Sequence, residues 1–180
     1  YNNTDKGATF YLELPLLDIN EKAEATKLLQ KEAPIVNTTQ DLHFDCTGKT
    51  ILIVEDEKEL REYLIESFTE TFKKVYAADN AISALETCRK KQPSIIVSDV
   101  MMPQMDGFEL CRQIKNDIRI SHIPVILLTA RYDQTGITTG YKSGADSYIP
   151  KPFDLAFLKV VVGNILKNRE KIHSQYVTVT

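Results

Sequence analysis

The sequence lacks a cysteine pair, a long apolar segment and an excess of positive charge. Its three cysteines form no Cys-x-x-Cys motif and have no ligand spacing with a histidine, so we expect no zinc site. No apolar run approaches the roughly 18–20 residues that span a bilayer. The net charge of −3 gives no reason to expect broad binding of nucleic acid. These absences predict a cytoplasmic segment that contacts neither a membrane nor nucleic acid.

The composition is otherwise that of an ordinary globular protein. At 180 residues, the chain is long enough for one domain with flanking segments. Cys88 and Cys111 fall on the apolar faces of expected helices, so both are predicted to be small core side chains in a reducing compartment. The polar opening residues are unlike a signal peptide, and no Met stands first, so we expect a fragment of a longer protein.

Three zones follow one another along the chain. Residues 9–14 alternate between apolar and polar side chains and end at Pro15, as a single strand would. Residues 18–47 are polar and charged, with a helix expected at 19–31, and are predicted to be a linker. From Lys49 onward, apolar runs alternate with helical spacing. The predicted segments are a strand remnant at 1–17, the linker at 18–47, a globular domain at 48–169 and a tail at 170–180.

Five short apolar runs in the globular segment are expected to be strands. They lie at residues 51–54, 75–78, 95–98, 125–128 and 147–149. The first run is apolar throughout, which is typical of a parallel strand buried on both faces. Five strand–helix units in about 120 residues predict an α/β fold, a doubly wound parallel sheet with helices on both faces. In such a sheet, binding residues lie beyond the carboxyl ends of the strands.

Four of the expected strand ends carry side chains suited to one site. These side chains are Glu55 and Asp56 after the first run, Asp99 after the third, Thr129 after the fourth and Lys151 after the fifth. Clustered carboxylates repel one another, which raises their pKa values unless a cation neutralises them. Oxygen ligands without His or Cys suit a hard ion such as Mg²⁺. Acidic residues at strand ends also cap helices, and for Glu57 alone we prefer that interpretation.

Four motifs in this segment resemble the receiver domain of bacterial response regulators. They are Ile-Leu-Ile-Val-Glu-Asp at 51–56, Ser-Asp-Val-Met-Met-Pro-Gln-Met-Asp-Gly at 98–107, Leu-Thr-Ala at 128–130 and Gly-Ala-Asp-Ser-Tyr-Ile-Pro-Lys-Pro-Phe at 144–153. The resemblance covers residues 49–169. It implies the flavodoxin-like receiver fold, a five-stranded parallel sheet in the order 2-1-3-4-5, with the N-terminal strand and linker outside it.

The resemblance also implies a role for each residue at the strand ends. Asp99 would be the phospho-acceptor, Thr129 and Lys151 would hold the phosphoryl oxygens, and Tyr148 would be the aromatic switch residue. A Mg²⁺ or Mn²⁺ ion would be bound by Glu55, Asp56, Asp99 and the backbone carbonyl of Met101. Glu55 stands where the family often has Asp, which leaves its coordination mode open.

Two backbone features are expected on the same grounds. The Lys151–Pro152 peptide bond is predicted to be cis, because an X-Pro bond costs only about 0.5–1 kcal/mol to hold in that form. Gly107 is predicted to serve the backbone of the loop after Asp99 rather than the chemistry.

The implied function is that of a phospho-accepting receiver in two-component signal transduction. A phosphohistidine on the phosphotransfer domain of a histidine kinase would supply the phosphoryl group, and Asp99 would attack it in line. The receiver itself is not a conventional enzyme, and a receiver–receiver dimer is left open. Residues 133–141 hold two glycines and three threonines, which predicts a marginal helix beside Thr129. Switching elements are usually drawn from such regions of low stability.

The flanking segments suggest a longer parent protein. Residues 7–15 resemble the last strand of the ATP-binding domain of sensor histidine kinases. This implies a hybrid histidine kinase, which could carry the phosphotransfer domain in the same chain and be anchored in the inner membrane. Separated from that domain, the strand should pair poorly or borrow a partner. Residues 170–180 would lead to an output domain, which in one hybrid subfamily is a helix-turn-helix domain of the arabinose-regulator type.

Three other classes of protein fit parts of the pattern. An aspartate-nucleophile phosphatase of the haloacid dehalogenase type carries Asp-x-Asp after its first strand, whereas Asp99 follows the third. A flavodoxin needs a phosphate loop after its first strand, where the acidic residues 55–57 would repel the phosphate. A degenerate receiver that acts only as a protein-interaction scaffold is disfavoured because the acidic pair, the acceptor, the threonine and the lysine are all present.

Overall fold

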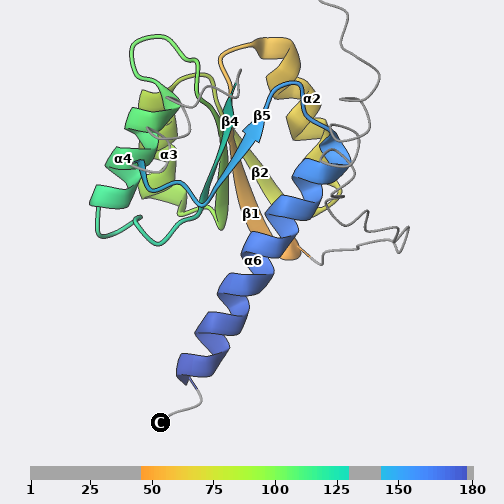
Figure 1. Cartoon of the computed structure of the whole chain (residues 1–180), viewed down its shortest axis with the longest axis vertical. Coiled ribbons are helices and arrows are strands. Elements are labelled where there is room, and N and C mark those ends of the chain that lie inside the picture. Colours follow the sequence, from red (N-terminus) through yellow and green to blue (C-terminus); the bar gives the residue numbers. More distant parts are fainter. Residues whose placement is uncertain (1–45, 130–142, 178–180) are drawn as a thin grey trace, which may run out of the picture. The chain divides into compact units, whose positions relative to one another are not determined.

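The computed structural model of the protein describes residues 46–129 and 143–177, with side chains up to residue 172 (Figure 1). The chain divides between Asp41 and Leu42, and every described residue belongs to the unit Leu42–Thr180. The strand predicted at 9–14, the linker as far as residue 45 and the helix predicted at 133–141 lie outside the described residues.

Five parallel strands form one sheet in the order β2-β1-β3-β4-β5. The bounds of the strands are β1 Cys46–Val54, β2 Phe72–Ala78, β3 Ile95–Asp99, β4 Val125–Thr129 and β5 Ser147–Pro150. The fold class and the strand order expected from the sequence are therefore confirmed.

Strands β1 and β2 begin earlier than their apolar runs predicted. Cys46 pairs with Phe72, and both side chains are buried. The register between the two strands shifts between Cys46 and Thr50, where exposed and polar residues interrupt the apolar run. Because the early pair lies beyond that interruption, the apolar run alone could not reveal it. β1 therefore starts within the predicted linker, ahead of the domain start predicted at residue 48.

The described helices cover both faces of the sheet, with α3 and α4 on one side and α2 and α6 on the other (Figure 1). Their bounds are α2 Lys58–Thr69, α3 Ala81–Lys91, α4 Gly107–Asn116 and α6 Leu155–Val177. Alternate residues of β1 enter different clusters: Leu52 packs on the α3–α4 side, while Ile51 and Ile53 pack on the α2–α6 side. Each fully buried aliphatic side chain contributes about 1.5–3 kcal/mol, so the two clusters hold the central strands rigidly in place.

The cysteines are part of this core. Cys88 and Cys111 are free and fully buried, as predicted, and Cys46 is buried as well. Burial raises the pKa of the Cys88 thiol to about 12. Because the thiolate is the reactive form, this cysteine is a packing residue at neutral pH.

Helix α6 continues through Val177, past the domain end predicted at residue 169. In its second half, the Arg169 guanidinium donates hydrogen bonds to the carbonyl of His122 and, over 2.9 Å, to Oδ1 of Asp146. Lys49 of β1 forms an ion pair with Glu170 at 2.7 Å. These contacts hold the long helix against the amino-terminal edge of the sheet. No helix in the described part of the chain is long and apolar enough to cross a membrane.

Candidate functional site

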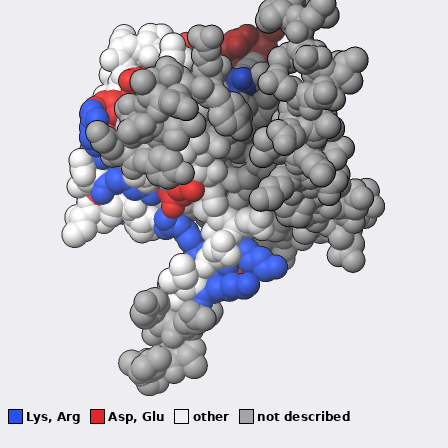
Figure 2. All heavy atoms as spheres, viewed as in Figure 1, with Lys and Arg blue, Asp and Glu red and all other residues white. Residues whose placement is uncertain are grey.

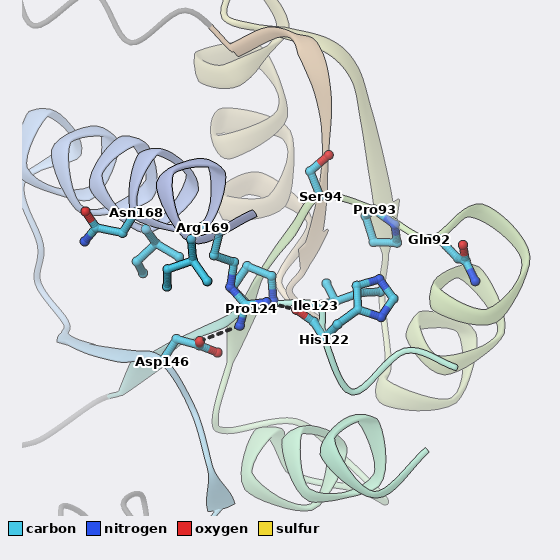
Figure 3. A pocket seen from close by; sticks show the side chains of 11 residues that line it. Gln92, Pro93, Ser94, His122, Ile123, Pro124, Asp146, Asn168 and Arg169 are labelled. Atoms are coloured by element: carbon cyan, nitrogen blue, oxygen red, sulfur yellow. Dashed lines mark hydrogen bonds and ion pairs between the residues drawn. The ribbon is translucent and has the colours of Figure 1, made fainter. Parts of the chain in front are cut away.

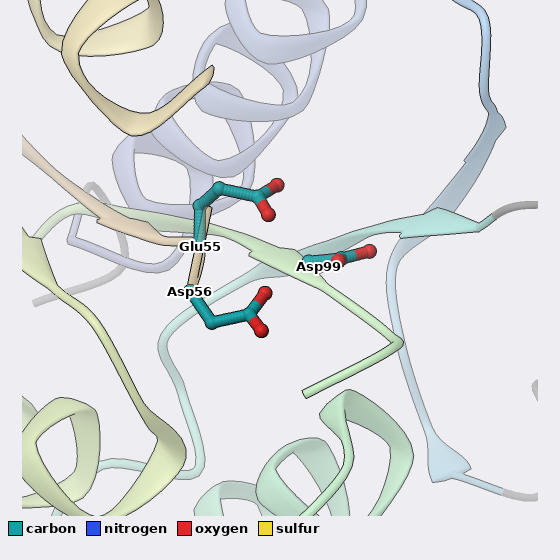
Figure 4. Close-up of side chains that lie close together, drawn as sticks. All are labelled: Glu55, Asp56 and Asp99. Atoms are coloured by element: carbon teal, nitrogen blue, oxygen red, sulfur yellow. The ribbon is translucent and has the colours of Figure 1, made fainter. Parts of the chain in front are cut away.

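Three carboxylates meet at the carboxyl ends of β1 and β3. Glu55 and Asp56 directly follow β1, and Asp99 is the last residue of β3. All three side chains project from the strand ends in the same direction (Figure 4), and their ligand oxygens lie within 4.8 Å of one another. Glu55 and Asp99 are 1% and 5% exposed, whereas Asp56 is exposed. The cluster, called the acidic pocket below, therefore combines two buried carboxylates with one that is exposed.

Strand register brings these residues together. Val54 of β1 is paired with Ser98 of β3, so the residues that follow them emerge side by side. The Glu55 amide donates to the carbonyl of Ala78 at 3.2 Å, and the Val100 amide donates to the carbonyl of Leu128 at 2.9 Å. Both strand exits are thus anchored to the neighbouring strands, which fixes the backbone on which the carboxylates stand.

Lys151 reaches the same pocket from beyond β5. Its Nζ lies 2.9 Å from Oε2 of Glu55, to which it donates a hydrogen bond, and 3.1 Å from Oδ1 of Asp99. Its amide donates to the carbonyl of Thr129 at 2.6 Å. The Lys151–Pro152 peptide bond is cis, as predicted. The ammonium group is therefore held by its own backbone next to the two buried carboxylates.

The pKa values of Glu55 and Lys151 reflect this crowding. Burial raises the pKa of Glu55, and the charge of Asp99 raises it further, although the hydrogen bond from Lys151 works in the opposite direction. For Lys151, burial alone would lower the pKa, but the hydrogen bond to Glu55 and the charge of Asp99 outweigh it, so its pKa is raised. Lys151 is thus a cation beside two buried carboxylates, and its one positive charge is outnumbered by the three acidic groups of the cluster.

One buried oxygen of Asp99 shows where further positive charge fits. Among the described residues, Oδ1 of Asp99 forms an ion pair with Nζ of Lys151 at 3.1 Å and accepts no further hydrogen bond. An ionised carboxylate has about four lone-pair sites, so the oxygens of Asp99 can bind a further cation beside Lys151. The donor set consists of oxygens, with no His or Cys, which suits a hard divalent ion. The residues present therefore fit Mg²⁺.

The loop between β3 and α4 turns tightly around Asp99. The Gly107 amide donates to the carbonyl of Val100 at 2.9 Å, and a Cβ at Gly107 would stand 2.3 Å from the carbonyl oxygen of Asp99. Asp106 caps α4 by accepting a hydrogen bond from the Glu109 amide at 2.7 Å. Gly107 therefore serves the loop backbone, as predicted. The side chain of Met101 in this loop is 68% exposed.

Thr129 and Tyr148 lie on neighbouring strands, β4 and β5. Thr129 ends β4, the strand beside β3, and its carbonyl accepts from Lys151. Tyr148 is half-buried against the α3–α4 cluster, and its hydroxyl lies 3.2 Å from Oγ of Ser143. The structure thus brings Glu55, Asp56, Asp99 and Lys151 together, with Thr129 on the next strand end and Tyr148 on the α4 side of the sheet.

Sequence reasoning missed Arg61 of α2. Its Nη1 donates to the carbonyl of Glu55 at 2.7 Å and to the carbonyl of Asp56 at 3.1 Å. The only signal in the sequence is a cation on the second turn of the expected helix after three consecutive acidic residues. Because helix-surface arginines are common, that signal does not indicate a contact with the backbone of the acidic turn.

A hollow of ≈ 770 Å³ lies away from the acidic pocket, between the amino ends of β3 and β4 and the second half of α6 (Figure 3). Arg169 crosses it to reach Asp146 and the carbonyl of His122. Lys and Arg side chains gather along this lower part of α6 (Figure 2). The hollow and the carboxylate cluster thus lie at opposite edges of the sheet, with Glu55, Asp56 and Asp99 at the carboxyl edge.

A parallel sheet in the order β2-β1-β3-β4-β5, with buried carboxylates and a lysine at its carboxyl edge, is the arrangement expected of a receiver domain. The model of the response regulator receiver domain family matches residues 51–162, so the chain belongs to that family, whose members act in two-component signal transduction. The expected resemblance is confirmed.

Individual relatives agree with this assignment. "Histidine kinase P4" of Formosa agariphila is 41% identical over 140 residues, which is 78% of this chain and 10% of that protein. Transcriptional regulatory protein AfsQ1 of Streptomyces coelicolor is 37% identical over 68% of this chain and 53% of its own length. This chain therefore spans about half of one curated relative and a tenth of the other.

Solved structures show the same fold. The signal receiver domain of a signal transduction histidine kinase from Syntrophus aciditrophicus is 36% identical, with a TM-score of 0.64 over 67% of this chain and 92% of its own. The BeF3-activated receiver domain of DrrB is 29% identical, with a TM-score of 0.61 over 67% of this chain and 99% of its own. Both are receiver domains over almost their whole length.

Proposed function

We propose that this receiver accepts a phosphoryl group on Asp99 from the phosphohistidine of a histidine kinase. The observation that carries the proposal is the buried Asp99 carboxylate, which lies next to the acidic pair and forms an ion pair with Lys151. An oxygen of Asp99 attacks the phosphorus, the P–N bond breaks, and its electron pair stays on the imidazole nitrogen. The product is an aspartyl phosphate, and its lifetime is the signal.

Receiver domains generally bind Mg²⁺ at an acidic pocket, and in this chain we propose Glu55, Asp56, Asp99 and the carbonyl of Met101 as its ligands. When bound, the ion, or Mn²⁺ in its place, neutralises charge on the carboxylates and on the incoming phosphoryl group. Glu55 is held by its hydrogen bond from Lys151, whereas exposed Asp56 is free to meet the ion from the open side. This division follows from the burial of the two side chains.

The remaining residues act on the phosphoryl oxygens and on the output surface. Lys151 is held between Glu55 and Asp99, so its ammonium stands beside the acceptor before transfer. Thr129, at the end of the neighbouring strand, supplies a hydroxyl for a second oxygen. Tyr148 is the proposed switch residue, since it lies on β5, next to the strand that ends in Thr129, and packs against the α3–α4 cluster.

The parent protein is proposed to be a hybrid histidine kinase. Receiver domains interact with histidine kinases, and one relative of this chain is named as such a kinase. That alignment covers 140 residues, more than the span 51–162 of the family match, so the similarity extends into the flanks. The proposal retains the strand remnant at residues 1–17, a phosphotransfer domain in the same chain and a cytoplasmic location, while the receiver itself extends from β1 at Cys46 into α6 beyond residue 169.

Intact-mass measurement after incubation with acetyl phosphate and Mg²⁺ tests the acceptor. We expect the addition of one phosphoryl group, which should disappear in Asp99→Asn and in excess chelator. Asp79→Asn is the matched control, because Asp79 also follows a strand, and its described contacts are to Asn80 and Ser83 outside the pocket. An adduct of unchanged yield in Asp99→Asn would show that the proposal is wrong. No adduct on the native chain would favour a scaffold function.

A further inference from the structure

The turn that carries Glu55 and Asp56 is hydrogen-bonded through its backbone carbonyls to Arg61, which is not one of the proposed ligands. We propose that Arg61 is a positioning residue for divalent-cation binding. Its guanidinium bridges the carbonyls of Glu55 and Asp56 and fixes the direction in which their carboxylates project. The inference rests on the proposed function, because it assigns to Arg61 the preorganisation of that same site.

The hydrogen bonds of the turn show why such a bridge matters. Glu57 is the N-cap of α2, but its side chain makes no capping hydrogen bond. Within the turn, the Glu57 amide reaches Oε1 of Glu55 only at 3.4 Å. The two bonds from Arg61 Nη1, at 2.7 and 3.1 Å, are shorter. Arg61 therefore ties consecutive peptide units of the turn to the second turn of the helix.

Arg61 and Lys151 are both cations at the site, but they contact different kinds of oxygen atom. Residues 55–57 place three acidic groups in succession, and a fourth, Glu59, lies in the first turn of α2. Lys151 contacts carboxylate oxygens, which are also the oxygens that a cation would use. Arg61 instead contacts carbonyl oxygens, so its charge offsets the repulsion within the turn while it leaves the carboxylates available. Outer contacts of this kind set the orientation of metal ligands.

A pair of variants separates this contact from a general charge effect. Arg61→Met removes the bridge and one positive charge. Lys58→Met removes one positive charge from the first turn of the same helix, where Lys58 pairs only with Glu62 among the described residues. Losing an outer-sphere partner typically weakens metal binding about 10–100-fold. We therefore expect Arg61→Met to bind Mg²⁺ at least about 10-fold more weakly than native protein, and Lys58→Met to stay within about 2-fold.

Calorimetric titration of the unphosphorylated chain with MgCl₂ is the measurement, with Asp56→Asn as the reference for loss of a ligand. If Arg61→Met and Lys58→Met bind Mg²⁺ equally, the inference is wrong, even when Arg61→Met unfolds at lower urea concentration. If Asp56→Asn binds like the native chain, the proposed metal site itself fails, which is a separate outcome. Should Arg61→Met not fold, Arg61→Gln and Lys58→Gln repeat the comparison, because the shorter amide cannot bridge both carbonyls.

A second readout distinguishes positioning from a direct role in transfer. At Mg²⁺ concentrations that saturate the variant, Arg61→Met should be phosphorylated by acetyl phosphate at the native rate, because Arg61 touches no reacting atom. A rate that stays at least 10-fold low at saturation would overturn the assignment of Arg61 as a positioning residue.

Discussion

Gly107 leaves no room for a side chain behind Asp99. Its hypothetical Cβ would lie 2.3 Å from the carbonyl oxygen of Asp99 and 2.9 Å from the Cα of Val100, both of them backbone atoms that cannot rotate away. The last turn of the loop can therefore fit an alanine only if the backbone that carries Asp99 moves. Because glycine has no side chain, α4 can start at Gly107, in close contact with the backbone of Asp99.

We predict that Gly107→Ala lowers the free energy of unfolding by about 1–3 kcal/mol, the usual cost of overpacking. Because the displaced backbone belongs to Asp99, phosphorylation by acetyl phosphate should slow as well. Urea denaturation and intact-mass kinetics measure the two effects. Gly48→Ala is the control, since nothing lies within 4 Å of its Cβ position. Equal stability of the two variants would contradict the close approach at Gly107.

At the scale of elements, α6 is joined to the sheet by two different kinds of contact. Its first half buries Leu158 and Val162 in the α2–α6 cluster. In its second half, the most specific contact is that of Arg169 with Asp146 and the His122 carbonyl. Apolar burial should therefore stabilise the first half of α6, and the polar contacts of Arg169 and Glu170 the second half.

Replacing Arg169 with Met should loosen only the second half of α6. We expect hydrogen exchange of amides after residue 166 to become at least several-fold faster, while amides near Leu158 keep their protection, because opening there still exposes the core. Lys167→Met provides the control, since Lys167 is exposed on the same stretch. Uniformly faster exchange along the whole helix would show instead that α6 is one cooperative unit.

The sequence predicted the elements whose signals are local and missed those set by distant contacts. The apolar runs at 51–54 and 125–128 identified β1 and β4, and the strand-end rule placed Asp99 beside the acidic pair. The start of β1 at Cys46 depends on pairing with Phe72, across an interruption that carries no apolar signal. Arg61 was likewise missed, because its partners are carbonyl groups, which every residue possesses.

At the scale of the whole molecule, Asp146 joins elements that are far apart in the sequence. It accepts hydrogen bonds from Nζ of Lys115 at 2.8 Å, the Val125 amide at 2.9 Å and Arg169 at 2.9 Å. Burial alone would raise its pKa, but the hydrogen bonds from Lys115 and Val125, the charge of Lys115 and the bond from Arg169 outweigh it, so the pKa of Asp146 is lowered. The ionised carboxylate is the form that the fold favours.

This shift predicts a pH dependence of stability with a definite sign. The folded pKa lies below the unfolded value of about 3.9, so the stabilisation is fully present above that pH and is lost as the pH falls through the folded pKa. We expect Asp146→Asn to lower the unfolding free energy at pH 5–7 by about 1–3 kcal/mol. Below about pH 4 the difference from native protein should shrink. Urea denaturation across this range is the measurement, and a difference independent of pH would contradict the prediction.

The uninterrupted length of α6 also determines how the receiver would orient anything fused after it. An α-helix turns once in about 3.6 residues and rises about 1.5 Å per residue. Inserting one residue near Val177 would therefore swing an attached module by roughly 100° about the helix axis, whereas inserting seven would return it close to its original azimuth, about 10 Å farther out. The activity of a reporter joined to this helix should therefore depend more on its rotation about the helix axis than on its distance from the receiver.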